Sequence, residues 1–244
     1  TFSVEGIDIT SDKARVKFDA LKLDGFSVKP TLEGLRAWLA RPEPRGAAPD
    51  AAKMIPKLGA LRLEGITVEP KDGKSAGPIT LRGFELTLAD PFEGIPTRSR
   101  IAIEGLAAPL NLDKPDKSLQ DLIAMGYARI NVSAAFEAAW SEPTRQVAIR
   151  TLEFAGLDML DFRSNAILGN VPKEAFSTDK AIAQVAWLGA TARQLELSLV
   201  NKGFFERLLA REAKKAGQSP EDLRSQWGMM AMIGASAALG DSEG

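Results

Sequence analysis

Histidine and cysteine are both absent from this chain of 244 residues. Histidine is the commonest general base near neutral pH, and the two residues together supply most zinc ligands. Thiol nucleophiles and disulfides are excluded as well, because both need cysteine. Most familiar active sites therefore cannot be assembled from these residues, and we expect a protein that is not an enzyme and that uses no metal or cofactor.

Long apolar runs and an excess of one charge are missing too. The formal net charge is −1, from 31 basic and 32 acidic residues, so nucleic acid is not an expected partner. The most apolar stretch, WGMMAMIGASAALG at residues 227–240, is shorter than the roughly 18 apolar residues of a membrane-spanning helix. The chain starts at Thr1 inside a strand-like segment, so its start carries no information on a signal peptide, an anchor or localisation.

A short repeat, apolar-x-Gly-apolar, is the clearest pattern that the chain contains. Its copies are VEGI at 4–7, LDGF at 23–26, LEGI at 63–66, LRGF at 81–84, IEGL at 103–106 and FAGL at 154–157. Alternating apolar residues predict strands around each glycine, but the alternation changes parity there, as Leu61 and Leu63 give way to Ile66 and Val68. Copies about 20 residues apart suit strands and turns better than helical repeats.

Two structures would keep the apolar side chains on one face across the change of parity. The first is a β-bulge, in which the glycine takes a left-handed conformation and one extra residue restores the phase. The second is a two-residue hairpin turn with x-Gly at its tip, which favours Asn, Asp or Gly before the glycine, and only Asp24-Gly25 fits that pattern. We therefore favour bulges, with hairpins and plain strand ends as the alternatives.

Bulges at similar points in several strands would bend a sheet strongly. The fold class that we expect is α+β, with one or more strongly curved, bulged antiparallel β-sheets packed around amphipathic helices. Residues 1–190 would form the repeated strand region with short helical insertions. Residues 191–244 would add a strand and a C-terminal helical segment that packs on the same domain.

Helical spacing of apolar residues predicts helices at 30–40, 118–126, 173–188 and 203–217. The alternation of Leu195, Leu197 and Leu199 predicts a strand at 192–202. A Pro/Gly/Ala-rich linker follows the first helix at 41–50. The last helix has the most specific start signal, with Ser219 as N-cap, Pro220 at the first position and Glu221 and Asp222 in the first turn. Its Met-rich continuation predicts an ordinary buried helix, or alternatively one that lines a lipid cavity or contacts a partner.

Two small patterns hint at chemistry without supporting it. Ser177 and Lys180 match S-x-x-K, the pattern of a serine nucleophile activated by lysine, but its companion motifs are missing. Asp158 and Asp161 could share a calcium ion, but a three-residue offset in a strand sends them to opposite faces. We interpret the first pair as a helix start and the second as solvated turn residues.

The strands LRLEGITVEP, ITLRGFELTLAD and RQVAIRTLEFAGLDML resemble the repeated β-segments of bacterial AsmA-like envelope proteins. More loosely they resemble tubular lipid-binding (TULIP-type) domains, in which a coiled sheet wraps a helix around an apolar groove. The ending LELSLVNKGFFERLLAREAKKAGQSPEDL is similar to segments of uncharacterised proteobacterial envelope proteins. These resemblances imply a periplasmic or envelope domain without catalytic residues that shields lipid, in lipid transport or outer-membrane homeostasis, with an envelope protein as a further partner.

The expected function is therefore to bind or shield a lipid or another hydrophobic molecule in an apolar groove. The alternative is a structural or scaffold domain of the envelope whose core is filled by its own side chains. The residues that we expect to line the groove are Phe26, Val28, Trp38, Ile66, Val68, Phe84, Leu86, Phe154, Leu157, Phe204, Leu208, Trp227 and Met230.

Overall fold

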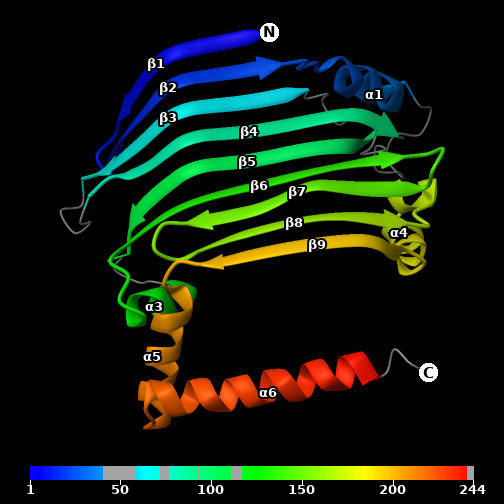
Figure 1. Ribbon diagram of the computed structural model, residues 1–244. Helices are drawn as coiled ribbons and strands as arrows, with labels where there is room; N and C mark the ends of the chain where they lie inside the picture. The colour runs from blue at the N-terminus through cyan, green and yellow to red at the C-terminus, as the bar shows by residue number, and fades with distance from the viewer. Residues whose placement is uncertain (41–58, 72–76, 93, 111–116, 241–244) are drawn as a thin grey trace.

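A computed structural model shows a single open antiparallel sheet whose nine strands follow one another in chain order (Figure 1). The strands are β1 (Phe2–Thr10), β2 (Ala14–Asp24), β3 (Ala60–Pro70), β4 (Ile79–Phe92), β5 (Ile95–Pro109), β6 (Arg129–Ser141), β7 (Gln146–Gly156), β8 (Leu160–Gly169) and β9 (Thr191–Asn201). The structure describes residues 1–40, 59–71, 77–92, 94–110 and 117–240, with the backbone alone for Pro30 and 234–240. The linker expected at 41–50 lies outside these residues.

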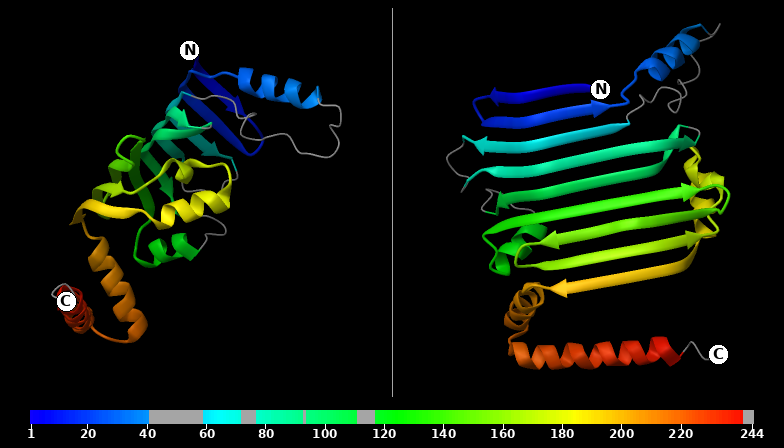
Figure 2. Two further views of the ribbon diagram at one scale, coloured as in Figure 1. Left: turned by 90° about the vertical axis from the view of Figure 1, so that its right-hand side faces the viewer. Right: turned by 45° about the horizontal axis from the view of Figure 1, so that its top comes forward.

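The helices gather at the ends of the strands and beyond β9 (Figures 1 and 2). They are α1 (Lys29–Leu39), α3 (Lys117–Ala124), the 3-10 helix η1 (Lys173–Phe176), α4 (Lys180–Leu188), α5 (Phe204–Ala216) and α6 (Pro220–Gly240). The predicted helices are confirmed, except that the segment 173–188 is divided into η1 and α4. The predicted N-cap is confirmed too, since the backbone N–H of Asp222 donates to Ser219 Oγ at 3.1 Å.

The repeated glycines in β1, β3 and β5 lie on one line across the sheet. Gly6, Gly65 and Gly105 have φ values of 65°, 61° and 60°, in the left-handed region that favours glycine. The register from β1 to β5 continues without a shift through this line, so each neighbouring strand changes parity at the same place. Two other copies of the repeat lie at strand ends, where Gly25 follows β2 and Gly156 ends β7.

The expected fold class, a strongly curved and bulged sheet packed around helices, is wrong. The sheet is neither closed nor strongly curled, and no described helix lies across its middle. The reason is that a bulge bends a strand when its extra residue faces none on the partner. From β1 to β5, both strands of each neighbouring pair change parity at the same place. Neither strand therefore has an extra residue, and no bend accumulates.

The concerted shift gives the sheet one apolar face and one polar face. On the apolar face, one row of direct cross-strand partners is apolar in all nine strands: Val4, Leu21, Leu63, Phe84, Ile103, Ala134, Phe154, Phe162 and Leu199. The next row has a single polar member: Phe2, Leu23, Leu61, Leu86, Ile101, Phe136, Leu152, Ser164 and Leu197. Charged residues such as Arg62, Glu85 and Glu153 alternate with these rows and form the polar face.

Candidate functional site: the uncovered apolar face

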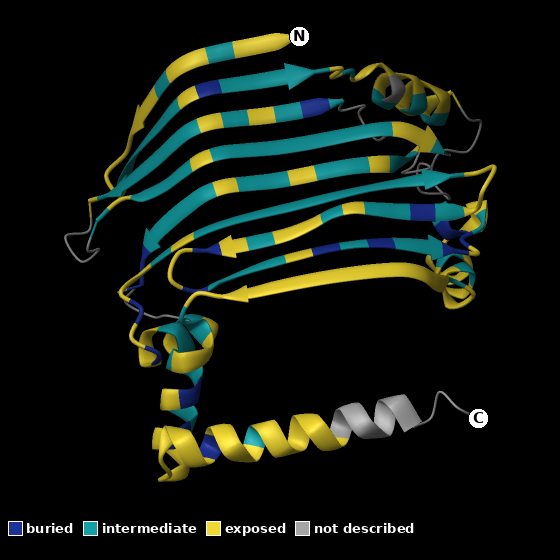
Figure 3. Ribbon diagram, viewed as in Figure 1, coloured by how far each residue is buried: buried dark blue, intermediate teal, exposed yellow. Residues whose placement is uncertain are grey.

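The middle of the apolar face is open. Ile101 and Leu152 stand in its second row at the centre of the sheet, and they are 41% and 40% exposed. At the β9 edge the exposure of Leu197 and Leu199 rises to 64% and 66%, and Figure 3 shows β9 exposed along its whole length. An apolar sheet face normally packs against a second layer. Here the described helices leave the centre of that face to solvent.

One end of the apolar face is closed by a chain of aromatic rings in contact with one another. Phe92 packs edge-on against Trp140 with ring centroids 5.9 Å apart, and Trp140 lies 4.8 Å from Phe176, which in turn contacts Trp187 at 6.2 Å. The indole N–H of Trp140 donates to the carbonyl of Val171 at 3.0 Å. Because each buried indole needs a partner for its N–H, this bond fixes the orientation of the ring. The cluster joins η1 and α4 to β6 and β7.

The other end is closed by α3 and α5. Tyr127, Met125 and Met159 are buried there, with Phe204 and Leu208 packed against them from α5. The Tyr127 hydroxyl donates to the carbonyl of Asp158 at 2.8 Å, and the guanidinium of Arg207 lies 4.5 Å above its ring. Burial raises the pKa of Tyr127, while the nearby Arg207 opposes that rise. The two end clusters therefore bracket an open apolar surface between them.

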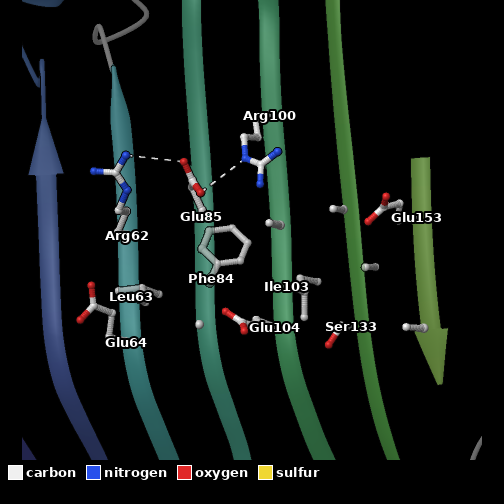
Figure 4. A pocket seen from close by; sticks show the side chains of 15 residues that line it. Arg62, Leu63, Glu64, Phe84, Glu85, Arg100, Ile103, Glu104, Ser133 and Glu153 are labelled. Carbon is white, nitrogen blue, oxygen red and sulfur yellow. Dashed lines mark hydrogen bonds and ion pairs between the residues drawn. The ribbon is translucent and has the colours of Figure 1, made fainter. Parts of the chain in front are cut away.

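The polar face holds a shallow depression of about 320 Å³ opposite this surface (Figure 4). Small residues, Gly83, Ala102 and Ala135, line its floor, and Arg62, Glu85 and Arg100 line its rim. The charged side chains there are paired across the strands. Glu85 contacts Arg62 at 3.6 Å and Arg100 at 3.5 Å.

The ion pairs continue beyond the depression as a ladder across six strands. Asp24 contacts Arg62 at 3.8 Å on one side, and on the other Arg100 contacts Glu137 at 3.1 Å. Glu137 also contacts Arg150 at 3.5 Å. Each charge of the ladder therefore has a partner of opposite sign. Within the described part of the chain, no three acidic residues come together where they could hold a metal ion.

The structure separates the residues that the sequence suggested for one groove. Five lie half-buried on the apolar face: Ile66, Val68, Phe84, Leu86 and Phe154. The other eight lie elsewhere. Phe26 and Val28 flank a separate depression at the start of α1, and Trp38 is on α1. Leu157 is in the β7–β8 turn, and Phe204 and Leu208 belong to the cluster around Tyr127. Trp227 of α6 packs against α5, and Met230 is exposed on α6.

Several residues that shape this site were not singled out by the sequence. Ile101 and Leu152 hold the most exposed positions at the centre of the face, and Trp140 anchors one end of it. The signal for the first two was available, because both belong to alternating strand patterns. Nothing in the sequence indicated that Phe92 and Phe176 would pack against Trp140, since these contacts join three distant segments.

Comparison with known proteins leaves the function open. Residues 153–244 match a protein-family model whose description reads only "Uncharacterized protein". No curated protein and no solved structure matches the chain. Among the described residues, no helix is long and apolar enough to cross a membrane.

Proposed function

We propose that this chain is a non-enzymatic domain whose apolar sheet face binds an acyl chain or another hydrophobic molecule. The observation that carries the proposal is the exposure of Ile101 and Leu152 at the centre of the second of two adjacent apolar rows. Soluble proteins rarely leave a contiguous apolar surface of this kind without a binding role. We further propose the cell envelope as its location, on the strength of the strand resemblance to AsmA-like proteins.

The chemistry of the face favours a ligand without hydrogen-bonding groups. Ser164 is the only polar side chain in the two rows, and a ligand with many polar groups would lose its hydrogen bonds to water there without replacement. Each row crosses nine strands, which at about 4.8 Å between strands gives a length of about 38 Å. A long alkyl chain can lie along such a row and bury its methylenes, each worth about 0.8 kcal/mol.

Titration with a fluorescent fatty acid tests this proposal. Leu152→Lys places a charge in the middle of the apolar face, at a site exposed enough to accept the longer side chain. The matched control is Ala155→Lys, which adds the same charge three residues along β7, on the polar face, at another exposed position.

We expect Leu152→Lys to weaken binding of the probe at least tenfold, and Ala155→Lys to leave binding unchanged. Both variants should keep the far-UV circular dichroism of the parent chain. Equal binding by all three proteins would contradict the proposal. Absence of binding by the parent chain would contradict the proposal and favour the alternative of a structural or scaffold domain.

A further inference from the structure

The repeated four residues are complementary to themselves when they pair antiparallel. In β3 and β4, Leu63 faces Phe84 and Glu64 faces Gly83, so the first apolar residue meets the last and the large residue meets the glycine. The same arrangement joins β4 to β5, where Gly83 faces Glu104. We call this four-residue unit the tetrad.

The strand β2 takes part with a variant of the tetrad. Its residues 18–21, FDAL, carry alanine where the other copies carry glycine. Ala20 faces Glu5 on one side and Glu64 on the other, and the register places Asp19 between Gly6 and Gly65. Five consecutive strands therefore pair tetrad to tetrad, with large and small residues alternating along the line.

Each tetrad seats a large side chain over a small neighbour. The side chain of Asp19 fills the space that a Cβ at Gly65 would need, and Arg82 lies over Gly105, with its Cβ 3.2 Å from the position of such a Cβ. Arg82 also forms an ion pair with Glu104, Nε to Oε1, at 3.2 Å. Pairing of the tetrads therefore gives complementary shapes between neighbouring strands from β1 to β5, and complementary charges where Arg82 lies beside Glu104.

The tetrad of β1, Val4–Ile7, is satisfied on one side only. β1 forms an edge of the sheet (Figure 1), and its Phe2 and Ile9 are 56% and 57% exposed. Among the described residues, nothing lies within 4 Å of the position of a Cβ at Gly6. The space over the glycine, which Asp19 fills at Gly65 and Arg82 fills at Gly105, is thus not filled by any described residue at Gly6.

We propose that the β1 edge binds a β-strand of a partner protein that carries apolar, Arg or Lys, Gly, apolar in sequence. The strand would add antiparallel, its basic side chain lying over Gly6 and contacting Glu5, as Arg82 lies over Gly105 and contacts Glu104. A second copy of this chain is disfavoured at this edge, because its own Glu5 would approach Glu5. The inference is independent of what binds the apolar face.

The opposite edge of the sheet, β9, lacks the repeated tetrad. β9 has no tetrad in its sequence TARQLELSLVN, so a strand added there would not be selected by an alternation of large and small residues. In Figure 1, α5 and α6 lie beyond β9, whereas no described helix or strand is drawn beyond β1 on its outer side. A tetrad strand should therefore choose β1.

A fluorescently labelled peptide of residues 79–88, ITLRGFELTL, serves as a stand-in for the partner strand, because it carries the basic tetrad of β4. Binding is measured by fluorescence anisotropy, and its place by hydrogen exchange along β1 and β9. The control peptide has Arg82→Glu. The control chain has Glu5→Lys, which alters an exposed edge residue.

We expect the parent chain to bind the Arg peptide about tenfold tighter than the Glu peptide, and the Glu5→Lys chain to reverse that order, since each swap turns an attractive cross-strand pair into a repulsive one. Exchange should slow in residues 2–10 and stay unchanged in β9. The proposal would be overturned if neither peptide binds, or if both bind equally and Glu5→Lys does not reverse their order. Protection at β9, or self-association of the chain through β1, would overturn it as well.

Discussion

The carboxylate of Asp19 in β2 occupies the space over Gly65 in β3 where any other residue would place its Cβ. Gly65 is thus constrained twice, by its φ of 61° and by its neighbour across the strands. Gly6, on the other side of Asp19, shares the backbone conformation, but no described residue comes within 4 Å of where its Cβ would stand. The two positions separate backbone strain from steric collision in one protein.

Gly65→Ala should destabilise the fold more than Gly6→Ala. The left-handed conformation alone costs a non-glycine residue about 1–2 kcal/mol, and we expect Gly6→Ala to lower the free energy of unfolding by about that amount. Gly65→Ala adds the collision with Asp19, and Asp19→Ala in the same chain should recover the added part. Urea unfolding measures all four proteins. Equal losses at the two glycines would show that Asp19 moves aside at no cost.

Tyr127 is the single tyrosine of the chain, so the absorbance of tyrosinate reports on it alone. Its pKa is raised from the ordinary value of 10.0, mainly by burial, which means that the folded state favours the neutral ring. Its contribution to stability is therefore complete below pH 10 and is lost as the pH rises through the folded pKa.

We expect the titration midpoint of the folded protein to lie above that of the protein in urea. Arg207→Gln should raise the folded midpoint further, because the guanidinium of Arg207 lowers the pKa of Tyr127. The prediction fails if the midpoints in buffer and in urea coincide.

The ion-pair ladder on the polar face should contribute little and should depend on salt. Glu137 contacts both Arg100 and Arg150, and its side chain is 25% exposed. Partly exposed pairs are each worth up to about 1 kcal/mol, and salt near 1 M screens charges beyond about 3 Å. Glu137→Gln should therefore destabilise the protein at low salt and much less at high salt.

Glu142→Gln, at an exposed position in the β6–β7 turn, is the matched control and should have no effect at either salt concentration. Thermal unfolding in low and high sodium chloride makes the comparison. A large, salt-independent loss in Glu137→Gln would instead indicate that packing around this side chain, rather than its charge, stabilises the strands.

The sequence predicted much of the local structure, because local signals determine it. The left-handed glycines at 6, 65 and 105 follow from the change of parity, and the start of α6 follows from the Ser219 cap. The predicted shape of the sheet was wrong because the shape depends on which residue of the neighbouring strand faces each glycine. β2 faces two of these glycines with FDAL, a tetrad without glycine. The apolar-x-Gly-apolar pattern therefore does not include β2, although the matching change of parity in β2 is what cancels each bulge.

The residues predicted for the candidate site also fall into two groups, one placed by local signals and one placed by distant contacts. Ile66 and Phe84 reach the apolar face through strand alternation together with the change of parity at the repeat, and both signals are local. Phe204 and Trp227 are on helices, whose placement depends on contacts such as the packing of Phe204 near Tyr127 and of Trp227 near Leu209. No spacing in the sequence encodes those contacts. A groove assembled from both sets could therefore not be read from periodicity.

Photo-crosslinking with a diazirine-bearing fatty acid shows whether the apolar face is open to a lipid. After irradiation, digestion and mass spectrometry locate the residues that carry the lipid. We expect adducts concentrated on the central apolar residues Ile101, Phe136 and Leu152, and their loss in the presence of excess unlabelled fatty acid. Adducts spread evenly over both faces, adducts confined to the exposed methionines of α6, or none at all would contradict it.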